Sequence, residues 1–393
     1  MIGFTKLLCG TATVSDVIKY RGKGDTPPQL LQFSDNSRPL VVWNATNRCN
    51  LRCQHCYIDA EDRKFKDELT TEEAQRFIED LAEMGVPVLL FSGGEPLLRK
   101  DLFELGRQAA DLGLRPVLST NGTLITDDIA LQIKEAGFQY VGVSIDGAPD
   151  THDRFRNRQG AFNEAMEGLR ACMRLGMKTG IRFTVNSLNQ QDLPEVIDII
   201  AAEGIPRFCM YHLVYAGRGE EMRNLDISFE EKRRVMDLLI EKTIALHEQG
   251  VEVEILTTDN HADGIYLANY MRKYIKERVG EVDQLLDMHG GCSAGTKFAN
   301  VDPRGNVHPC QFWQDYILGN VREKPFSQIW TGDDELLVQL RCKTEHVKGK
   351  CGRCNYKHYC GGCRIRARAV YGDLWAEDPG CYLSEDEIQA KGD

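Results

Sequence analysis

The chain has 393 residues, of which 42% are hydrophobic and 27% charged, and its formal net charge is -11. This length allows two or more domains, the acidic charge argues against nonspecific nucleic-acid binding, and no apolar run approaches the roughly 20 residues that span a membrane. Fourteen cysteines without a convincing signal peptide indicate metal sites in a reducing compartment, so we expect a cytoplasmic protein.

Residues 1–36 show little periodicity and are expected to form an N-terminal extension. Residues 37–216 alternate short apolar runs with longer amphipathic segments. We predict strands over 41–46, 88–92, 116–119, 140–145, 180–185 and 208–215. Helices are predicted between them, over 71–84, 102–112, 127–136, 161–175 and 193–203. This alternation predicts an α/β fold whose parallel sheet curves into a partial (β/α)6 barrel.

Three cysteines, Cys49, Cys53 and Cys56, follow the first predicted strand. A loop with these spacings can bring three thiolates to one face of an iron–sulfur cluster. Because four ligands close such a cluster, three leave one iron open to a small molecule. A zinc knuckle is the alternative, but structural zinc sites want four protein ligands. The ligand type and count therefore favour an iron–sulfur cluster.

Polar residues also follow the later strands, at the carboxyl ends where ligands gather in parallel sheets. Gly93, Gly94 and Glu95 follow the second strand, and two glycines allow a ligand to approach the backbone closely. The alternative is a strand-to-helix turn that binds no ligand, because many such turns have a similar sequence. The further candidates are Ser119 and Asn121 after the third strand, Ser144, Asp146 and Arg156 after the fourth, and Asn186 after the fifth.

Residues 217–290 differ in character, with helices predicted over 229–249 and 266–279 and a strand over 251–257. We interpret them as a bridge between domains. Residues 291–393 then hold a second group of cysteines, which comprises Cys292, Cys310, Cys351, Cys354, Cys360, Cys363 and Cys381. The pairs at 351–354 and 360–363 would suffice for a four-cysteine zinc ribbon. That interpretation leaves Cys292, Cys310 and Cys381 without a role.

The cysteine triplet, followed by Gly-Gly-Glu-Pro at 93–96, resembles the signature of the radical S-adenosylmethionine (SAM) enzymes. In that family the open iron of a [4Fe–4S] cluster chelates SAM, which one electron cleaves to methionine and a 5′-deoxyadenosyl radical. His55 takes the place of the aromatic residue that usually precedes the third cysteine. The resemblance implies SAM contacts from His55, Gly93, Gly94, Glu95, Ser119, Asn121, Ser144, Asp146, Arg156 and Asn186.

The later cysteines resemble the SPASM extension of radical SAM enzymes, which carries auxiliary [4Fe–4S] clusters. By that resemblance one complete cluster is held by Cys351, Cys354, Cys360 and Cys381. Cys292, Cys310 and Cys363 would hold a second one with a non-cysteine ligand, for which Asp287 and His289 are candidates, or would leave an iron open. The pattern departs from the family in having two residues, not three, between Cys360 and Cys363.

Residues 1–11, 31–34 and 42–49 resemble the branch of the family that acts on sirohaem-derived tetrapyrroles. This implies removal of two acetate side chains from 12,18-didecarboxysirohaem to leave iron-coproporphyrin III, with ferredoxin or flavodoxin as electron donor. Candidate cations for the substrate carboxylates are Arg156, Arg182, His212 and Arg218, although a surface role is the alternative for each. The alternative functions are propionate removal in haem d1 biosynthesis, peptide maturation, or a non-enzymatic electron carrier or scaffold.

Overall fold

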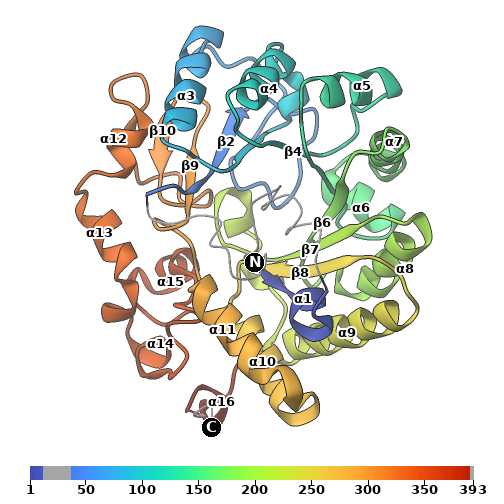
Figure 1. The fold of residues 1–393 in the computed structure, drawn as a ribbon, viewed down its shortest axis with the longest axis vertical. Coiled ribbons are helices and arrows are strands. Elements are labelled where there is room, and N and C mark those ends of the chain that lie inside the picture. Colours follow the sequence, from blue (N-terminus) through green and yellow to red (C-terminus); the bar gives the residue numbers. More distant parts are fainter. Residues whose placement is uncertain (12–36, 390–393) are drawn as a thin grey trace.

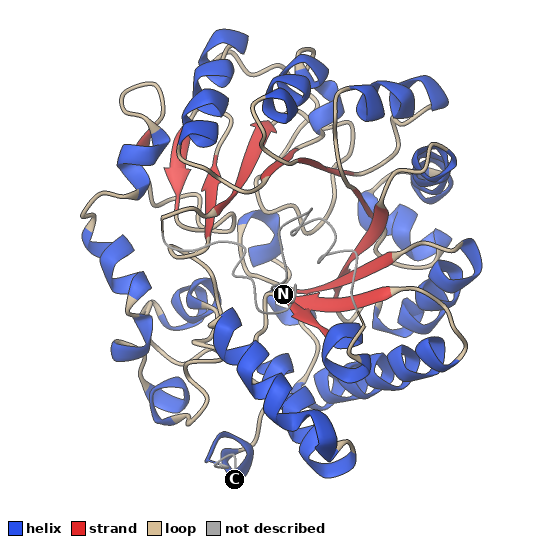
Figure 2. Cartoon of the chain, in the orientation of Figure 1, coloured by secondary structure: helices blue, strands red, loops and turns tan. Residues whose placement is uncertain are grey.

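The computed structural model describes residues 1–11 and 37–389. Most of the predicted N-terminal extension, including residues 31–34, lies outside the described residues. Within the described ranges one 11-stranded sheet has the strand order β1-β8-β7-β6-β5-β4-β3-β2-β9-β10-β11. The sheet is curved, and helices cover its outer side (Figure 1, Figure 2).

Seven neighbouring strands run parallel, which confirms the predicted parallel sheet and partial barrel. They are β2 (Leu40–Thr46), β3 (Leu89–Gly93), β4 (Pro116–Thr120), β5 (Val141–Ser144), β6 (Thr179–Val185), β7 (Arg207–His212) and β8 (Glu254–Thr258). In β2, for example, every residue after Leu40 is buried. Near-continuous apolar runs of this kind suit parallel strands, because both of their faces are covered.

The barrel helices are amphipathic and begin at local signals. They are α3 (Thr71–Glu83), α4 (Leu102–Asp111), α5 (Asp127–Glu135), α6 (Pro149–Arg156), α7 (Ala161–Arg174), α8 (Leu193–Glu203) and α9 (Phe229–Glu248). At the start of α3, the Thr70 hydroxyl accepts a hydrogen bond from the Glu73 amide at 3.3 Å, and the Glu73 carboxylate accepts one from the Thr70 amide at 2.9 Å. This capping box satisfies two backbone donors that would otherwise lack partners.

Residues 217–290, which the sequence suggested as a bridge, continue the barrel. Their strand β8 pairs in parallel with β7, with Arg207 opposite Glu254, and is the seventh parallel strand rather than part of a separate linker. Helix α9 packs against α8 and against α1 (Phe4–Cys9). Helices α10 (Ala262–Tyr274) and α11 (Val279–His289) then lead to the C-terminal cysteines. The domain boundaries at 216 and 290 stay predictions, and one sheet crosses both.

The C-terminal region joins the sheet at the edge next to β2. Strand β9 (Phe298–Val301) runs parallel to β2, and β10 (Asn306–His308) and β11 (Gly319–Asn320) follow in antiparallel pairing. The helices here are α12 (Phe326–Trp330), α13 (Glu335–Arg341), α14 (Gly349–Arg353), α15 (Arg364–Tyr371) and α16 (Glu385–Gln389). At the other edge β1 (Ile2–Gly3) pairs antiparallel with β8. No helix in the described part of the chain combines the length and apolarity needed to cross a membrane.

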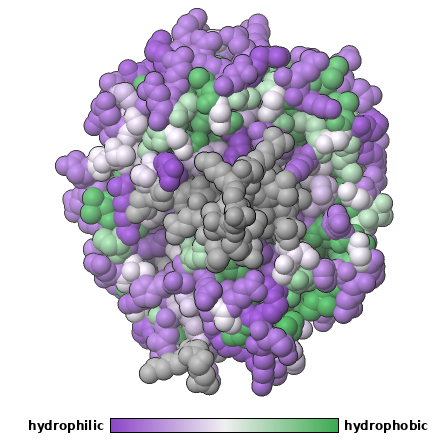
Figure 3. Space-filling view, viewed as in Figure 1, coloured by the Kyte–Doolittle hydropathy of each residue, from purple (hydrophilic) through white to green (hydrophobic). Residues whose placement is uncertain are grey.

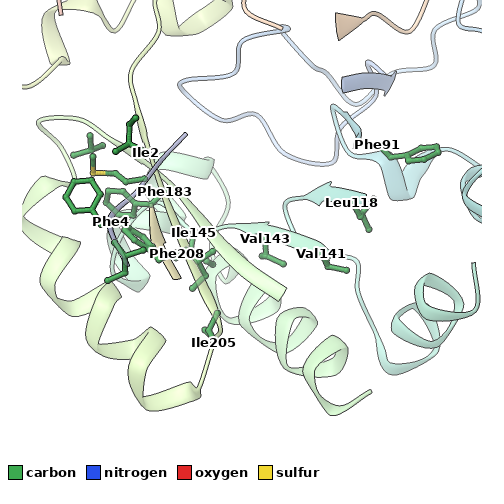
Figure 4. Packing of buried hydrophobic residues seen from close by; sticks show 14 of the residues in the cluster. Ile2, Phe4, Phe91, Leu118, Val141, Val143, Ile145, Phe183, Ile205 and Phe208 are labelled. Carbon is green, nitrogen blue, oxygen red and sulfur yellow. The ribbon is translucent and has the colours of Figure 1, made fainter. Parts of the chain in front are cut away.

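One apolar core connects the barrel with the C-terminal region. The Trp43 ring of β2 lies 5.8 Å from the Phe77 ring of α3, and Phe77 lies 6.2 Å from Phe326 of α12. Figure 4 shows other members of this core, among them Leu118 of β4 and Val143 of β5. The rim of the molecule in Figure 3 is mainly hydrophilic by contrast. The two cysteine-containing regions are therefore held in one packed unit.

Truncation of a core leucine should destabilise the protein far more than truncation of a surface leucine. Leu118 is 0% exposed and Leu131 of α5 is 45% exposed. We expect Leu118→Ala to lower the free energy of unfolding by about 2–5 kcal/mol and Leu131→Ala to change it by about 0.5 kcal/mol or less. Urea unfolding of both variants measures this, and equal midpoints would contradict the packing described above.

Candidate functional site

The barrel encloses a cavity of about 540 Å³. Its lining includes side chains at the carboxyl ends of successive strands, namely Ser92, Ser119, Ser144, Thr184, His212 and Thr258. His55 and Tyr57 of the first cysteine loop also line it, as do Cys292, Cys310 and Cys363 of the C-terminal region. The sheet thus brings polar strand ends and parts of both cysteine groups to one cavity.

Cys49, Cys53 and Cys56 pack together in the loop that follows β2, with Cys49 and Cys53 buried. Backbone amides already point at two of the sulfurs: the Leu51 amide donates to Cys49 Sγ and the Ala60 amide to Cys56 Sγ, each at 3.4 Å. Burial raises the pKa of the Cys49 thiol to about 12. A thiolate here needs a metal or nearby donors to stabilise it, and the three sulfurs with their N–H donors fit a cluster with one open iron.

A buried ion pair connects this loop with the fourth strand end. Arg156 of α6 pairs with Asp146 and also donates to Cys53 Sγ at 3.4 Å. Burial acts to raise the pKa of Asp146, but the charges of Arg156 and His55 and the hydrogen bond from the Thr184 amide together hold that pKa below its usual value. His55 lies 3.8 Å from the Asp146 carboxylate and stacks on Phe155 with ring centroids 4.5 Å apart. Burial lowers the pKa of His55 to about 4, so the ring is neutral at pH 7.

Glu95 and the two glycines before it pack the cysteine loop against β3. A Cβ atom on Gly93 would lie 2.4 Å from the Thr46 carbonyl oxygen, and one on Gly94 would lie 2.3 Å from the Arg48 carbonyl oxygen. Gly93 also has φ +125°, which disfavours other residues. The glycines are therefore required by the approach of two backbone segments, whatever ligand binds beside them.

The Glu95 carboxylate is fully buried and already hydrogen-bonded within the protein. It accepts from the Thr120 hydroxyl and the Asn121 amide at 2.8 Å and from the Leu97 amide at 3.1 Å. Burial raises its pKa to about 7. In this structure Glu95 thus fixes the third strand end, and its remaining role as a SAM contact stays a prediction.

The predicted SAM-binding residues fall into two groups in the structure. His55, Ser119, Ser144, Asp146 and Arg156 line the barrel cavity. The other five do not line it, namely Gly93, Gly94, Glu95, Asn121 and Asn186. Asn121 Nδ2 lies 3.9 Å from Cys49 Sγ, whereas the Asn186 side chain caps its own loop through the Leu188 amide and the Thr184 carbonyl.

The C-terminal cysteines divide into two sets. Cys351, Cys354, Cys360 and Cys381 surround a second, small cavity. Amides of Tyr356, Gly362 and Asp378 donate to three of these sulfurs at 3.3 to 3.4 Å. Four thiols around one small cavity fit one complete cluster, and this set of ligands stays a prediction.

The zinc-ribbon alternative does not fit this arrangement. Cys363, the last member of its second pair, lines the barrel cavity and not the small cavity of the other three. Zinc would also hold its sulfurs about 3.8 Å apart, given the Zn–S distance. Over residues 1–11 and 37–389, no three histidine, cysteine, aspartate or glutamate side chains are arranged to hold a single metal ion. A cubane, whose ligands lie farther apart, suits these cysteines better.

Cys292, Cys310 and Cys363 form the other set, at the wall of the barrel cavity. Burial raises the pKa of Cys310, and the neighbouring Cys292 and Cys363 sulfurs raise it further. Of the two predicted non-cysteine ligands, His289 lines the same cavity and Asp287 does not. Asp259, which the sequence analysis missed, also lines it. Asp259 lies two residues after the predicted strand 251–257. A polar residue at the carboxyl end of a strand is the signal that identified the other candidates.

Most of the cationic residues that were predicted to bind substrate carboxylates already have partners within the protein. Arg156 is paired with Asp146 as described, and buried His212 lies 2.9 Å from the Asp263 carboxylate. Arg218 does not line the cavity; it donates to the Cys53 carbonyl at 2.9 Å and supports the cysteine loop. Arg182 lines the cavity and donates to the Ser119 hydroxyl, and no carboxylate among the described residues pairs with it. Arg182 is thus the predicted cation that remains available to an anionic ligand.

Comparisons with known proteins agree with this site. The family model of the radical SAM superfamily matches residues 43–200, and that of the SPASM iron-sulfur cluster-binding domain matches residues 292–355. A Fe-coproporphyrin III synthase of Methanosarcina barkeri is 50% identical, over 99% of this chain and 99% of its own. A pre-heme d1 synthase of Dinoroseobacter shibae is 43% identical, over 92% and 90%.

The fold also resembles a solved structure. Streptococcus suis SuiB bound to S-adenosylmethionine superimposes with a TM-score of 0.68, at 19% identity, over 88% of this chain and 78% of that chain. At this identity the likeness concerns the fold alone.

Removal of one small-cavity cysteine should cost the protein one cluster. We expect Cys351→Ala to lower the iron content of anaerobically reconstituted protein by about four atoms per chain. Cys342→Ala is the matched control, because Cys342 is equally half-buried yet lines neither cavity. Iron and sulfide analysis measures both, and a Cys351→Ala protein with unchanged iron would contradict the assignment.

Proposed function

The chain belongs to the radical SAM superfamily and carries a SPASM iron–sulfur domain, and from this we propose that it removes the two acetate side chains of 12,18-didecarboxysirohaem. The product is iron-coproporphyrin III. The observation that carries the proposal is the 50% identity with a Fe-coproporphyrin III synthase over 99% of each chain. A match of that extent spans the regions of both cysteine groups.

The barrel cavity supports a substrate of this kind. Its volume of about 540 Å³ lies in the ordinary range of small-molecule sites. Apolar side chains such as Leu90, Val214 and Leu256 contribute to its wall and suit the flat face of a macrocycle. The polar strand ends described above lie around the same space, so one ligand can meet both kinds of surface.

The protein's own residues prepare the place where SAM would react. A cluster held by Cys49, Cys53 and Cys56 would supply the electron that cleaves SAM to a radical able to take a hydrogen atom from the substrate. Arg156 compensates the negative charge of both Asp146 and a Cys53 thiolate. The neutral His55 ring, held by Phe155, presents a flat surface beside the third cysteine. Arg218 fixes the loop backbone through the Cys53 carbonyl.

Arg182 is our candidate for binding a substrate carboxylate. Its guanidinium lies over Gly142 of β5, where a Cβ atom would come within 2.5 Å of Nε. The glycine therefore leaves room for the arginine to lie along the cavity wall. Because no described carboxylate pairs with Arg182, an anionic substrate side chain would gain a charge-assisted hydrogen bond without displacing a protein partner.

An external one-electron donor such as ferredoxin or flavodoxin belongs to this proposal, as does a cytoplasmic location. The pre-heme d1 synthase with 43% identity keeps propionate removal as the second candidate reaction. Peptide maturation has weaker support. A PqqA peptide cyclase of Granulibacter bethesdensis is 26% identical over 88% of this chain, and the structure of SuiB bound to its precursor peptide SuiA, at 18% identity, supports the fold alone.

Product analysis tests the proposed reaction. Reconstituted protein, SAM, dithionite and 12,18-didecarboxysirohaem should yield a product whose mass has decreased by two acetate groups. Cys53→Ala should abolish this product because the SAM-cleaving cluster loses a ligand, and Cys342→Ala should retain it. A mass loss that matches propionates would instead support the second candidate. Release of 5′-deoxyadenosine with an unchanged tetrapyrrole would contradict both.

Loss of the Arg182 charge should weaken substrate binding more than it slows the reaction. We expect Arg182→Gln to raise KM for the tetrapyrrole by about 10- to 100-fold, the value of one charge-assisted hydrogen bond, and Arg182→Lys to raise it less. Arg174→Gln is the control, because Arg174 is 54% exposed on α7 and pairs with Asp127. An unchanged KM in Arg182→Gln would exclude this contact.

A further inference from the structure

His212 is a buried histidine of the barrel cavity that the steps described so far do not use. It is the last residue of β7 and pairs with Val185 of β6, so it lies at the carboxyl end of the parallel strands. Its side chain is 1% exposed and lines the cavity. Because ligands of parallel sheets bind at this edge, the ring borders the space that is available to a bound molecule.

A buried carboxylate holds one nitrogen of this ring. Asp263, in the first turn of α10, has its Oδ2 atom 2.9 Å from His212 Nε2, and its side chain is 0% exposed. The Thr257 hydroxyl donates to Oδ2 at 2.6 Å, and the Tyr382 hydroxyl donates to Oδ1 at 2.8 Å. Asp263 is thus fixed by β8 and by the C-terminal segment, and its carboxylate in turn orients the His212 ring.

His212 is also the cation that this carboxylate can pair with. No lysine or arginine among the described residues pairs with Asp263, and its two other partners are neutral hydroxyls. A carboxylate buried away from water is costly unless its charge is compensated. A protonated His212 ring provides this compensation and carries a second proton on Nδ1.

The Nδ1 atom of His212 has no partner in the protein. It is shielded from solvent and makes no hydrogen bond with any described residue. A buried polar atom without a partner requires an explanation, and a molecule bound in the cavity that the ring lines supplies one. A histidine with a carboxylate at one nitrogen and a reacting molecule at the other is suited to proton transfer.

The other histidines that line the cavity lack this arrangement. His55 lies 3.8 Å from its nearest carboxylate, beyond hydrogen-bond distance, and that carboxylate is already paired with an arginine. His261 has no carboxylate at ion-pair distance in the described part of the chain, and its ring packs at 5.2 Å against the His289 ring. His289 Nε2 contacts the Met1 amino group at 2.9 Å.

We propose that His212 is the proton donor that completes the removal of each side chain, with Asp263 as its positioning residue. The inference rests on the proposed function. Homolysis of the bond between the macrocycle and an acetate side chain leaves one electron on the departing CH2–COO⁻ fragment. The other electron pairs with the one left on the macrocycle by hydrogen abstraction, and a ring double bond forms.

The departing fragment then needs one electron and one proton to become acetate. An iron–sulfur donor supplies the electron, and His212 Nδ1 supplies the proton, so that a C–H bond forms as the N–H bond breaks. His212 regains its proton from water after each turnover. Asp263 keeps the ring oriented and stabilises its protonated form.

Deuterium incorporation tests whether a proton is transferred. The holoenzyme is assayed in D2O with SAM, dithionite and 12,18-didecarboxysirohaem, and the released acetate is weighed by mass spectrometry. We expect one deuterium in each acetate, because the proton on His212 Nδ1 exchanges with water. Acetate without deuterium would have taken its hydrogen from a carbon atom and would overturn the proposal. This measurement needs no variant.

Variants then test whether His212 is the donor. We expect His212→Gln to lower kcat for acetate release by about 100-fold or more and to leave KM for the tetrapyrrole unchanged. Added imidazole should restore part of the rate of His212→Ala, because the space left by the ring opens to the cavity. Asp263→Asn should lower kcat less than His212→Gln does, again without a change in KM.

His308→Gln is the matched control. His308 is 0% exposed and lies 3.7 Å from the Asp302 carboxylate, but it does not line the cavity. Its variant should keep the kcat of the parent, and iron analysis shows whether each variant retains its clusters.

Two further results would contradict the role of His212 in protein with the parent's iron content. One is a His212→Gln variant with the kcat of the parent, and the other is a loss in His212→Ala that imidazole does not reduce. Failure of the proposed function is a different result, since the parent itself would then release no acetate. That result contradicts the reaction and this step together, whereas the two above contradict this step alone.

Discussion

The buried ion pair of Asp146 and Arg156 connects the parts on which the reaction site depends. Asp146 lies two residues beyond the end of β5 and accepts a hydrogen bond from the Thr184 amide of β6 at 2.7 Å, while Arg156 donates to Cys53 in the loop after β2. Removing one member of a fully buried pair generally costs about 3–5 kcal/mol, because the other charge is left without compensation. His55 lies at 3.8 Å from the same carboxylate. The position of the cysteine loop is thus set by charges on strand ends far away in the sequence.

Backbone contacts complete the same junction. The Gly94 amide donates to the Thr46 carbonyl at 2.7 Å and the Glu95 amide to the Arg48 carbonyl at 2.8 Å. Such contacts bring β3 against the loop that carries Cys49, and only glycine leaves enough room for them. The glycines thus belong to the packing of the cluster loop as much as to any ligand site.

The pairing of β9 with β2 determines how the second cysteine group meets the first. It joins the C-terminal region to the barrel edge beside the cluster loop. As a result Cys310 and His55 line one cavity although they are far apart in the chain, while Cys351 lies at a separate, smaller cavity. The C-terminal cysteines are therefore divided between two sites, one at the barrel cavity and one at the small cavity.

The sequence by itself determined the barrel and the local cysteine sites. Apolar periodicity and turn signals act between near neighbours, so the alternation of strands and helices and the cysteine loop after the first strand were predictable. That β8, within the predicted bridge of residues 217–290, pairs with β7 became visible only in the structure, because strand pairing across a sheet leaves no local pattern. Which cations stay unpaired, as Arg182 does and His212 does not, depends on partners brought from distant segments. The same holds for Asp259, whose Oδ2 atom the folded chain shields from solvent at the barrel cavity.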